Sequence, residues 1–183
     1  MPRQWWPDSE SAKAIIESEG PWPSPSPESN GRFLPLDVDR YKGCAVVVGF
    51  GPNRDAKDVL GSDEFERTDA GLWRHLGGGG GSNDLAERRD IREARGALHL
   101  RMSGGTGMAL FEARAEFEFA VFVCGPDVAT VEIRRQLGVR TADVRTGPGW
   151  LAVLWTKDDP PEVLAFTGKG AQTFSWMPPS EAA

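Results

Sequence analysis

Residues 150–155 read Trp-Leu-Ala-Val-Leu-Trp, and this stretch decides the fold class. It is apolar on both sides of an extended chain, which predicts a central strand buried on both faces with Trp150 and Trp155 in the core. Residues 43–50, Gly-Cys-Ala-Val-Val-Val-Gly-Phe, form a second continuous apolar run of strand length. Both runs fall far short of the about 20 residues that a membrane-spanning helix needs, so we expect no transmembrane segment.

Alternating segments surround these two runs. In residues 116–123, four apolar side chains share one face of a strand, opposite two glutamates: Phe117, Phe119, Val121 and Val123. Residues 98–102 and 131–134 have the same two-residue period, and turns rich in glycine and proline separate the segments. Short strands at this spacing predict a mostly β fold, an antiparallel sandwich or barrel-like arrangement with one or two short helices. An α+β fold is the alternative.

Three stretches are harder to interpret. Residues 54–70 are polar and ambiguous. Met108–Ala115 fits either a strand or a helical turn, and we favour the strand. Gly77–Gly81 is a run of five glycines, for which ordering the backbone is entropically costly, so we predict a mobile loop over residues 77–83.

The chain divides into an arm, one domain and a tail. Residues 1–31 predict a flexible arm rich in tryptophan and proline, in which a short helix follows Asp8 and ends at Gly20. Residues 21–27, Pro-Trp-Pro-Ser-Pro-Ser-Pro, favour extended polyproline geometry and cannot join the interior of a sheet. Residues 32–177 form the β-rich domain, and residues 178–183 are expected to be a disordered tail.

The composition is that of a globular protein. Hydrophobic residues make up 39% and charged residues 26% of the 183 positions, which suits one domain without a metal or disulfide scaffold. The formal net charge of −6 disfavours nucleic-acid binding. The N-terminus lacks the apolar stretch of a secretory signal, and Cys44 and Cys124 are expected to be buried, reduced thiols. We therefore expect a cytoplasmic protein that binds neither nucleic acid nor membrane, and the preference for arginine over lysine suggests a bacterial source.

No catalytic or cofactor-binding motif is complete. Gly49 and Gly51 fit the first part of the dinucleotide-binding pattern G-x-G-x-x-G, but Arg54 occupies the third glycine position. No serine stands at the centre of a Gly-x-Ser-x-Gly motif. The two histidines, His75 and His99, lie neither in a helical pair nor near a cysteine in the sequence, so we expect no metal site and no cofactor.

Several charged residues have both a functional and a structural explanation. His75 and Asp55 are the candidates for a catalytic site, with His75 as a general base beside the glycine loop. Asp37, Asp39 and Asp55 flank the first apolar run, and solvated loop acids explain them adequately. Four arginines concentrate positive charge near the C-terminal half: Arg134, Arg135, Arg140 and Arg145. On edge strands such charges discourage aggregation, and binding of an acidic partner is the alternative.

Three of the seven tryptophans lie in the predicted arm, which cannot form a core alone: Trp5, Trp6 and Trp22. Aromatic residues in such segments often dock into a partner, so these three are the candidate partner-binding residues. Alternatively, the arm folds back and covers an apolar patch of its own domain.

Together these patterns favour a non-enzymatic protein–protein interaction or accessory module, whose partner is another protein or a second copy bound through the arm. The alternative is a small hydrolase or nucleotide-binding enzyme with a site near His75 and the glycine-rich loop.

Overall fold

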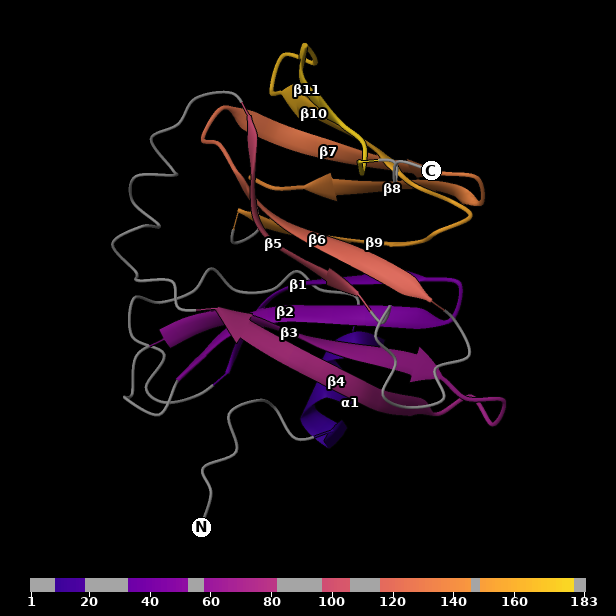
Figure 1. The fold of residues 1–183 in the computed structure, drawn as a ribbon. Coiled ribbons are helices and arrows are strands. Elements are labelled where there is room, and N and C mark those ends of the chain that lie inside the picture. The colour runs from indigo at the N-terminus through magenta and orange to yellow at the C-terminus, as the bar shows by residue number, and fades with distance from the viewer. Residues whose placement is uncertain are drawn as a thin grey trace.

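The computed structural model describes residues 9–18, 33–52, 58–81, 97–105, 116–145 and 149–179. Over these residues the chain forms one helix and eleven strands (Figure 1). The elements are α1 (Ser9–Glu17), β1 (Leu34–Tyr41), β2 (Cys44–Pro52), β3 (Asp58–Arg67), β4 (Trp73–Gly81), β5 (Leu98–Gly105), β6 (Phe117–Cys124), β7 (Val128–Arg135), β8 (Gly138–Asp143), β9 (Trp150–Thr156), β10 (Glu162–Thr167) and β11 (Gln172–Trp176).

The strands form three antiparallel sheets. Sheet A has the order β1-β2-β3-β4, sheet B the order β5-β6-β9, and sheet C the order β11-β10-β7-β8. In Figure 1, α1, sheet A, sheet B and sheet C follow one another from the bottom of the view to the top. The predicted mostly β, antiparallel fold is confirmed, and in the described part of the chain the sheets stack as layers without closing into a barrel.

Sheet B is the central layer, and its strands β6 and β9 are buried on both faces. One face, which includes Leu154, packs against sheet A. The opposite face, which includes Phe122 and Trp155, packs against sheet C. Trp150 and Trp155 are only 7% and 5% exposed, so the predicted burial of this strand is confirmed. The run from residue 150 to 155 is continuously apolar because each of its faces meets another sheet.

The helix α1 covers the outer face of sheet A. Ile16 is fully buried against Val47 and Phe65, so β2 also has an apolar layer on each side, as its sequence predicts. The Arg40 side chain holds the end of the helix, because its guanidinium donates hydrogen bonds to the backbone carbonyls of Ile16 and Ser18. Within the predicted arm the structure describes residues 9–18 alone, and the whole of that part lies on the domain.

The prediction of a mobile glycine loop is wrong for Gly77–Gly81, which form the second half of β4; residues 82 and 83 lie outside the described chain. Strand β3, in the stretch that looked ambiguous in sequence, supplies the backbone partners that order these glycines. At Gly78 the missing side chain is a packing requirement. A Cβ atom there would lie 2.5 Å from both Asp63 Oδ1 and the Ser62 carbonyl oxygen.

The neighbouring glycines give a direct test of this packing. We expect Gly78→Ala to lower the free energy of unfolding by about 1–3 kcal/mol, because the methyl group displaces the Asp63 carboxylate or the β3 backbone. Gly79→Ala is the control, since a Cβ there would meet no atom within 4 Å. Alanine at that position should be neutral or stabilise the protein by up to about 1 kcal/mol, because it restricts the unfolded chain. Urea denaturation of the two variants measures the difference, and equal effects would contradict the packing explanation.

The remaining fold predictions concern the cysteines and the unassigned segment. Cys44 and Cys124 are buried free thiols, as predicted. Burial raises the pKa of Cys44 to about 11 and that of Cys124 to about 12, so neither is a thiolate at neutral pH. Met108–Ala115 lie outside the described residues.

No helix in the described ranges is long and apolar enough to cross a lipid bilayer.

Candidate functional site

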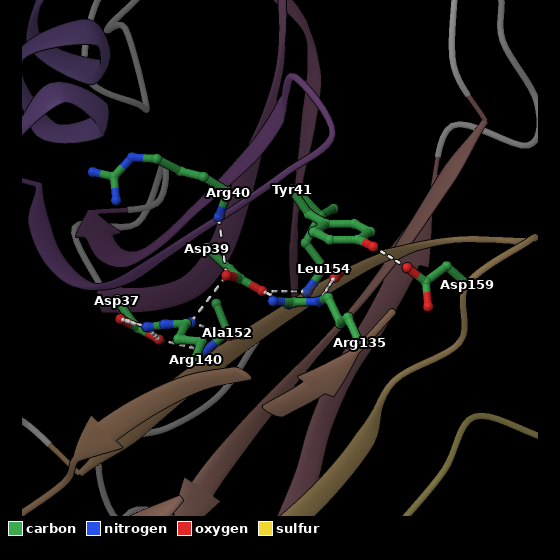
Figure 2. Close-up of polar contacts among 9 residues, drawn as sticks. All are labelled: Asp37, Asp39, Arg40, Tyr41, Arg135, Arg140, Ala152, Leu154 and Asp159. Atoms are coloured by element: carbon green, nitrogen blue, oxygen red, sulfur yellow. Dashed lines mark hydrogen bonds and ion pairs between the residues drawn. The ribbon is translucent and has the colours of Figure 1, made fainter. Parts of the chain in front are cut away.

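Four charged side chains, which we call the ionic seam, lie where the three sheets meet (Figure 2): Asp37, Asp39, Arg135 and Arg140. The two aspartates come from β1, at alternate positions that share one face of the strand. Arg135 ends β7 and Arg140 lies in β8. The seam therefore joins sheets A and C along the edge of β9 in sheet B.

The seam satisfies the backbone of β9 where a neighbouring strand would otherwise pair. The Ala152 amide donates to Asp37 Oδ2 at 2.8 Å, and the Leu154 amide donates to Asp39 Oδ2 at 2.7 Å. The carbonyl oxygens of the same two residues accept hydrogen bonds from Arg140 Nη1 at 2.9 Å and from Arg135 Nε at 3.0 Å. Strand β1 thus lies beside β9 through side chains instead of a backbone ladder.

The acids and bases of the seam also neutralise one another. Arg140 Nη2 lies 2.8 Å from Asp37 Oδ1, Arg140 Nη1 lies 3.2 Å from Asp39 Oδ1, and Arg135 pairs with Asp39. The negative charges of Asp37 and Asp39 raise the pKa of the Arg140 guanidinium above its ordinary value, although burial alone would lower that pKa. All four carboxylate oxygens accept hydrogen bonds. The seam therefore offers no free acid or base to a substrate, and its role is structural.

This arrangement corrects two predictions from the sequence. Asp37 and Asp39 are not solvated loop acids: Asp39 is 1% exposed, and both lie inside a strand. Arg135, 5% exposed, and Arg140 are ion-paired inside the molecule instead of standing on an edge strand's surface. Arg134 and Arg145 are exposed, as expected of surface charges. The difference arises because residues about 100 positions apart in sequence supply the partners.

The catalytic candidate His75 lies on β4 and is held by an acid that the sequence did not single out. Its Nε2 atom is 2.8 Å from Asp63 Oδ1, and the side chains are 44% and 2% exposed. The hydrogen bond to Asp63 raises the pKa of His75, and its hydrogen bond to the Gly77 backbone acts in the same direction. Because Asp63 and Glu64 both favour the charged ring, the arrangement favours the protonated imidazolium, which is a poor general base. The second catalytic candidate, Asp55, lies outside the described residues.

Two further polar residues adjoin His75. Burial raises the pKa of Glu64 to about 7, and the Ser62 hydroxyl donates to its Oε1 atom at 2.8 Å. One carboxylate oxygen of Asp63, Oδ2, is buried without a hydrogen-bond partner. Sequence reasoning missed these residues because residues 54–70 were not recognised as a strand, although Leu60 and Phe65 mark its apolar positions.

The candidate binding site is a groove at the end of sheet B, with a cavity volume of about 470 Å³. We call it the aromatic groove. It lies where β5 ends and β6 begins, and the residues after β11 bound it on the side of sheet C. Its apolar lining comes from four strands and the segment after β11: Leu100, Phe117, Phe119, Trp155, Trp176 and Pro179. The rings of Trp155 and Trp176 meet edge to face, with centroids 5.7 Å apart and planes at 69°.

Polar groups at the groove are already paired with one another. Trp155 Nε1 donates to Glu118 Oε2 at 3.1 Å, and Lys157 Nζ lies 3.5 Å from Glu116 Oε2. Leu100, which is 50% exposed, leaves an apolar side chain open to the solvent beside these residues. The adjacent strand β5 pairs with β6 and, in the part of the chain that the structure describes, with no other strand.

The predicted partner-binding residues Trp5, Trp6 and Trp22 lie outside the described residues, so their place relative to the groove stays a prediction. The groove itself was not predicted. Its residues are spread from position 100 to 179, and the one signal in the sequence was the abundance of tryptophan, 7 in all. Across the described ranges, no group of three or more His, Cys, Asp or Glu side chains could hold a metal ion.

The chain is a layered, antiparallel β protein with a groove lined by aromatic side chains at the end of sheet B. No protein-family model, no curated protein and no solved structure matches the chain.

Proposed function

We propose that this protein is a non-enzymatic protein-interaction module whose aromatic groove binds an extended segment of a protein partner. The observation that carries the proposal is the groove at the end of sheet B, where Trp155 and Trp176 stand edge to face beside the exposed Leu100. Trp155 is only 5% exposed and forms a buried wall of the groove, so the partly exposed Trp176 and Leu100 supply the contact area for a partner. Aromatic side chains provide such contacts at low entropic cost.

The surroundings of the groove support a peptide as its occupant. It runs beside β5, a strand at the edge of its sheet, and edge strands and aromatic grooves are two of the recurring sites for extended segments. Gly104 lets the Phe119 ring rest directly on the β5 backbone, because a Cβ atom there would lie 2.9 Å from that ring.

The geometry gives less support to a hydrolase or nucleotide-binding enzyme. His75 belongs to sheet A and does not line the groove, and its Nε2 atom is engaged by Asp63. The thiol pKa values of about 11 and about 12 exclude a ready nucleophile at Cys44 or Cys124. The acids that do line the groove, Glu116 and Glu118, are paired with Lys157 and the Trp155 indole.

The cellular setting is part of the same proposal. The two buried free thiols agree with a reducing compartment, which supports a cytoplasmic location. The preference for arginine over lysine supports a bacterial source.

A display library of random peptides, selected on the full-length protein, tests the proposal. We expect selected peptides to bind at least about tenfold more weakly to the Leu100→Asp variant, because a carboxylate replaces an apolar contact in the groove. Leu137→Asp is the matched control, since Leu137 is 73% exposed, lies between β7 and β8, and is not one of the residues that line the groove. Affinities from fluorescence anisotropy that are equal for both variants, or selection without any binder, would count against the groove as a binding site.

A further inference from the structure

The chain contains a segment whose chemistry suits the aromatic groove. Residues 21–27, Pro-Trp-Pro-Ser-Pro-Ser-Pro, hold four prolines and one tryptophan. Proline lacks a backbone N–H group and fixes its φ angle, so this sequence is biased towards the polyproline helix before it binds and loses little entropy on binding. Segments of this kind are recognised by grooves lined with aromatic side chains.

We propose that the aromatic groove binds residues 21–27 of a second copy of this chain, with Trp22 as the anchor beside Trp155 and Trp176. This inference rests on the proposed function, because it names the partner of the same groove. When each copy offers both a groove and a segment, two reciprocal contacts close a symmetric dimer.

The charges at the groove agree with this occupant. Residues 21–27 carry no charged side chain. At the groove, Lys157 is paired with Glu116, and Glu118 accepts a hydrogen bond from Trp155 Nε1, so a neutral segment adds no further charge that would need a partner there. A strongly acidic or basic peptide would have to bury its own charges against groups that are already paired.

The attachment points of the segment favour a second copy over the same chain. Ser18, at the end of α1, is held by Arg40, and Phe33 packs against the apolar cluster that α1 forms with sheet A. Both residues therefore lie on the α1 side of sheet A. The groove lies at the end of sheet B and is bounded by the residues after β11 of sheet C, on the other side of sheet A (Figure 1).

A labelled peptide spanning residues 19–31 tests the recognition step. Added to full-length protein at low concentration, it should bind the wild type and Leu137→Asp alike, and Leu100→Asp at least about tenfold more weakly. The same peptide with Trp22→Ala should lose binding by about tenfold or more, because it lacks the anchor.

The mass of the full-length protein in sedimentation equilibrium tests the second copy. We expect a dimer that dissociates on dilution, and a monomer at the same concentration for Trp22→Ala and for Leu100→Asp. An equimolar mixture of these two variants should regain dimer, though a weaker one than the wild type forms, because each mixed pair retains one of the two groove–segment contacts.

The outcomes separate the inference from the proposed function. If library peptides bind the groove but the 19–31 peptide does not, the inference is overturned and the proposed function stands. If neither binds, both fail. If the peptide binds in the groove and the protein is monomeric at every concentration, the second copy is the wrong occupant and this inference is overturned.

Discussion

Replacing Asp39 with asparagine is expected to lower the free energy of unfolding by about 3–5 kcal/mol, the usual cost of removing one partner from a buried ion pair. Asp39 is the centre of the ionic seam: it faces Arg135 and Arg140 and accepts the Leu154 amide at 2.7 Å. An asparagine of the same size removes the negative charge and leaves two buried guanidinium groups with Asp37 as their only partner in the seam. Urea denaturation followed by tryptophan fluorescence measures the loss.

The surface pair Asp143–Arg145 supplies the control. Its side chains are 42% and 59% exposed, and its closest atoms are 3.3 Å apart. Water and salt screen such a pair, so Asp143→Asn should cost less than about 1 kcal/mol. A similar small cost for Asp39→Asn would show that the seam is not the stabilising element we describe.

The double variant Asp39→Leu, Arg135→Met separates the two roles of the seam. Removing one acid and one base together restores the charge balance, so this variant should be more stable than Asp39→Asn. It should still be less stable than the wild type, because the amide and carbonyl of Leu154 lose the partners that they have at 2.7 and 3.0 Å.

The second large effect is a dependence of stability on pH that is centred on Glu64. Burial raises the pKa of this carboxyl to about 7 in the folded protein, from its ordinary value of 4.5. The folded state therefore holds the proton more tightly than the unfolded chain does. Its contribution to stability is fully present below about pH 4.5 and is lost as the pH rises through about 7, a difference of about 2–3 kcal/mol.

Glu64→Gln should remove this dependence while keeping an acceptor for the Ser62 hydroxyl. We expect the variant to be about 2–3 kcal/mol more stable than the wild type at pH 8 and close to it at pH 5. The raised pKa of His75 acts in the same direction, so the variant retains a smaller slope. Glu17→Gln, at the exposed end of α1, is the control and should leave the slope unchanged. A wild-type protein that becomes less stable between pH 8 and pH 5 would contradict the assignment.

The strands that could be predicted are those whose pattern is local. Residues 98–102, 116–123 and 131–134 alternate in hydrophobicity, and the structure has β5, β6 and β7 there. The glycine strand could not be predicted, since a run such as Gly77–Gly81 has no side-chain period. This strand is ordered because its backbone pairs with that of β3. Gly78 has to be a glycine because Asp63 fills the space that a side chain would need.

The candidate site was less predictable than the fold, because its parts are distant in the sequence. His75 was recognised as a candidate, but its partner Asp63 was hidden in a strand that the pattern did not reveal. Leu100, Trp155 and Trp176 each fit an ordinary strand or its end, and they form a groove only after sheet B has packed against sheet C.

The sequence by itself determined that this chain is a layered β protein with residues 150–155 at its centre, because periodicity and continuous hydrophobicity are properties of neighbouring residues. The tertiary structure decided which charges are buried: Asp37 and Arg140 meet across 103 positions of sequence to seal the edge of β9. A charge in one strand is stable inside a protein only if a distant strand supplies its partner, and that pairing exists only once the sheets have come together.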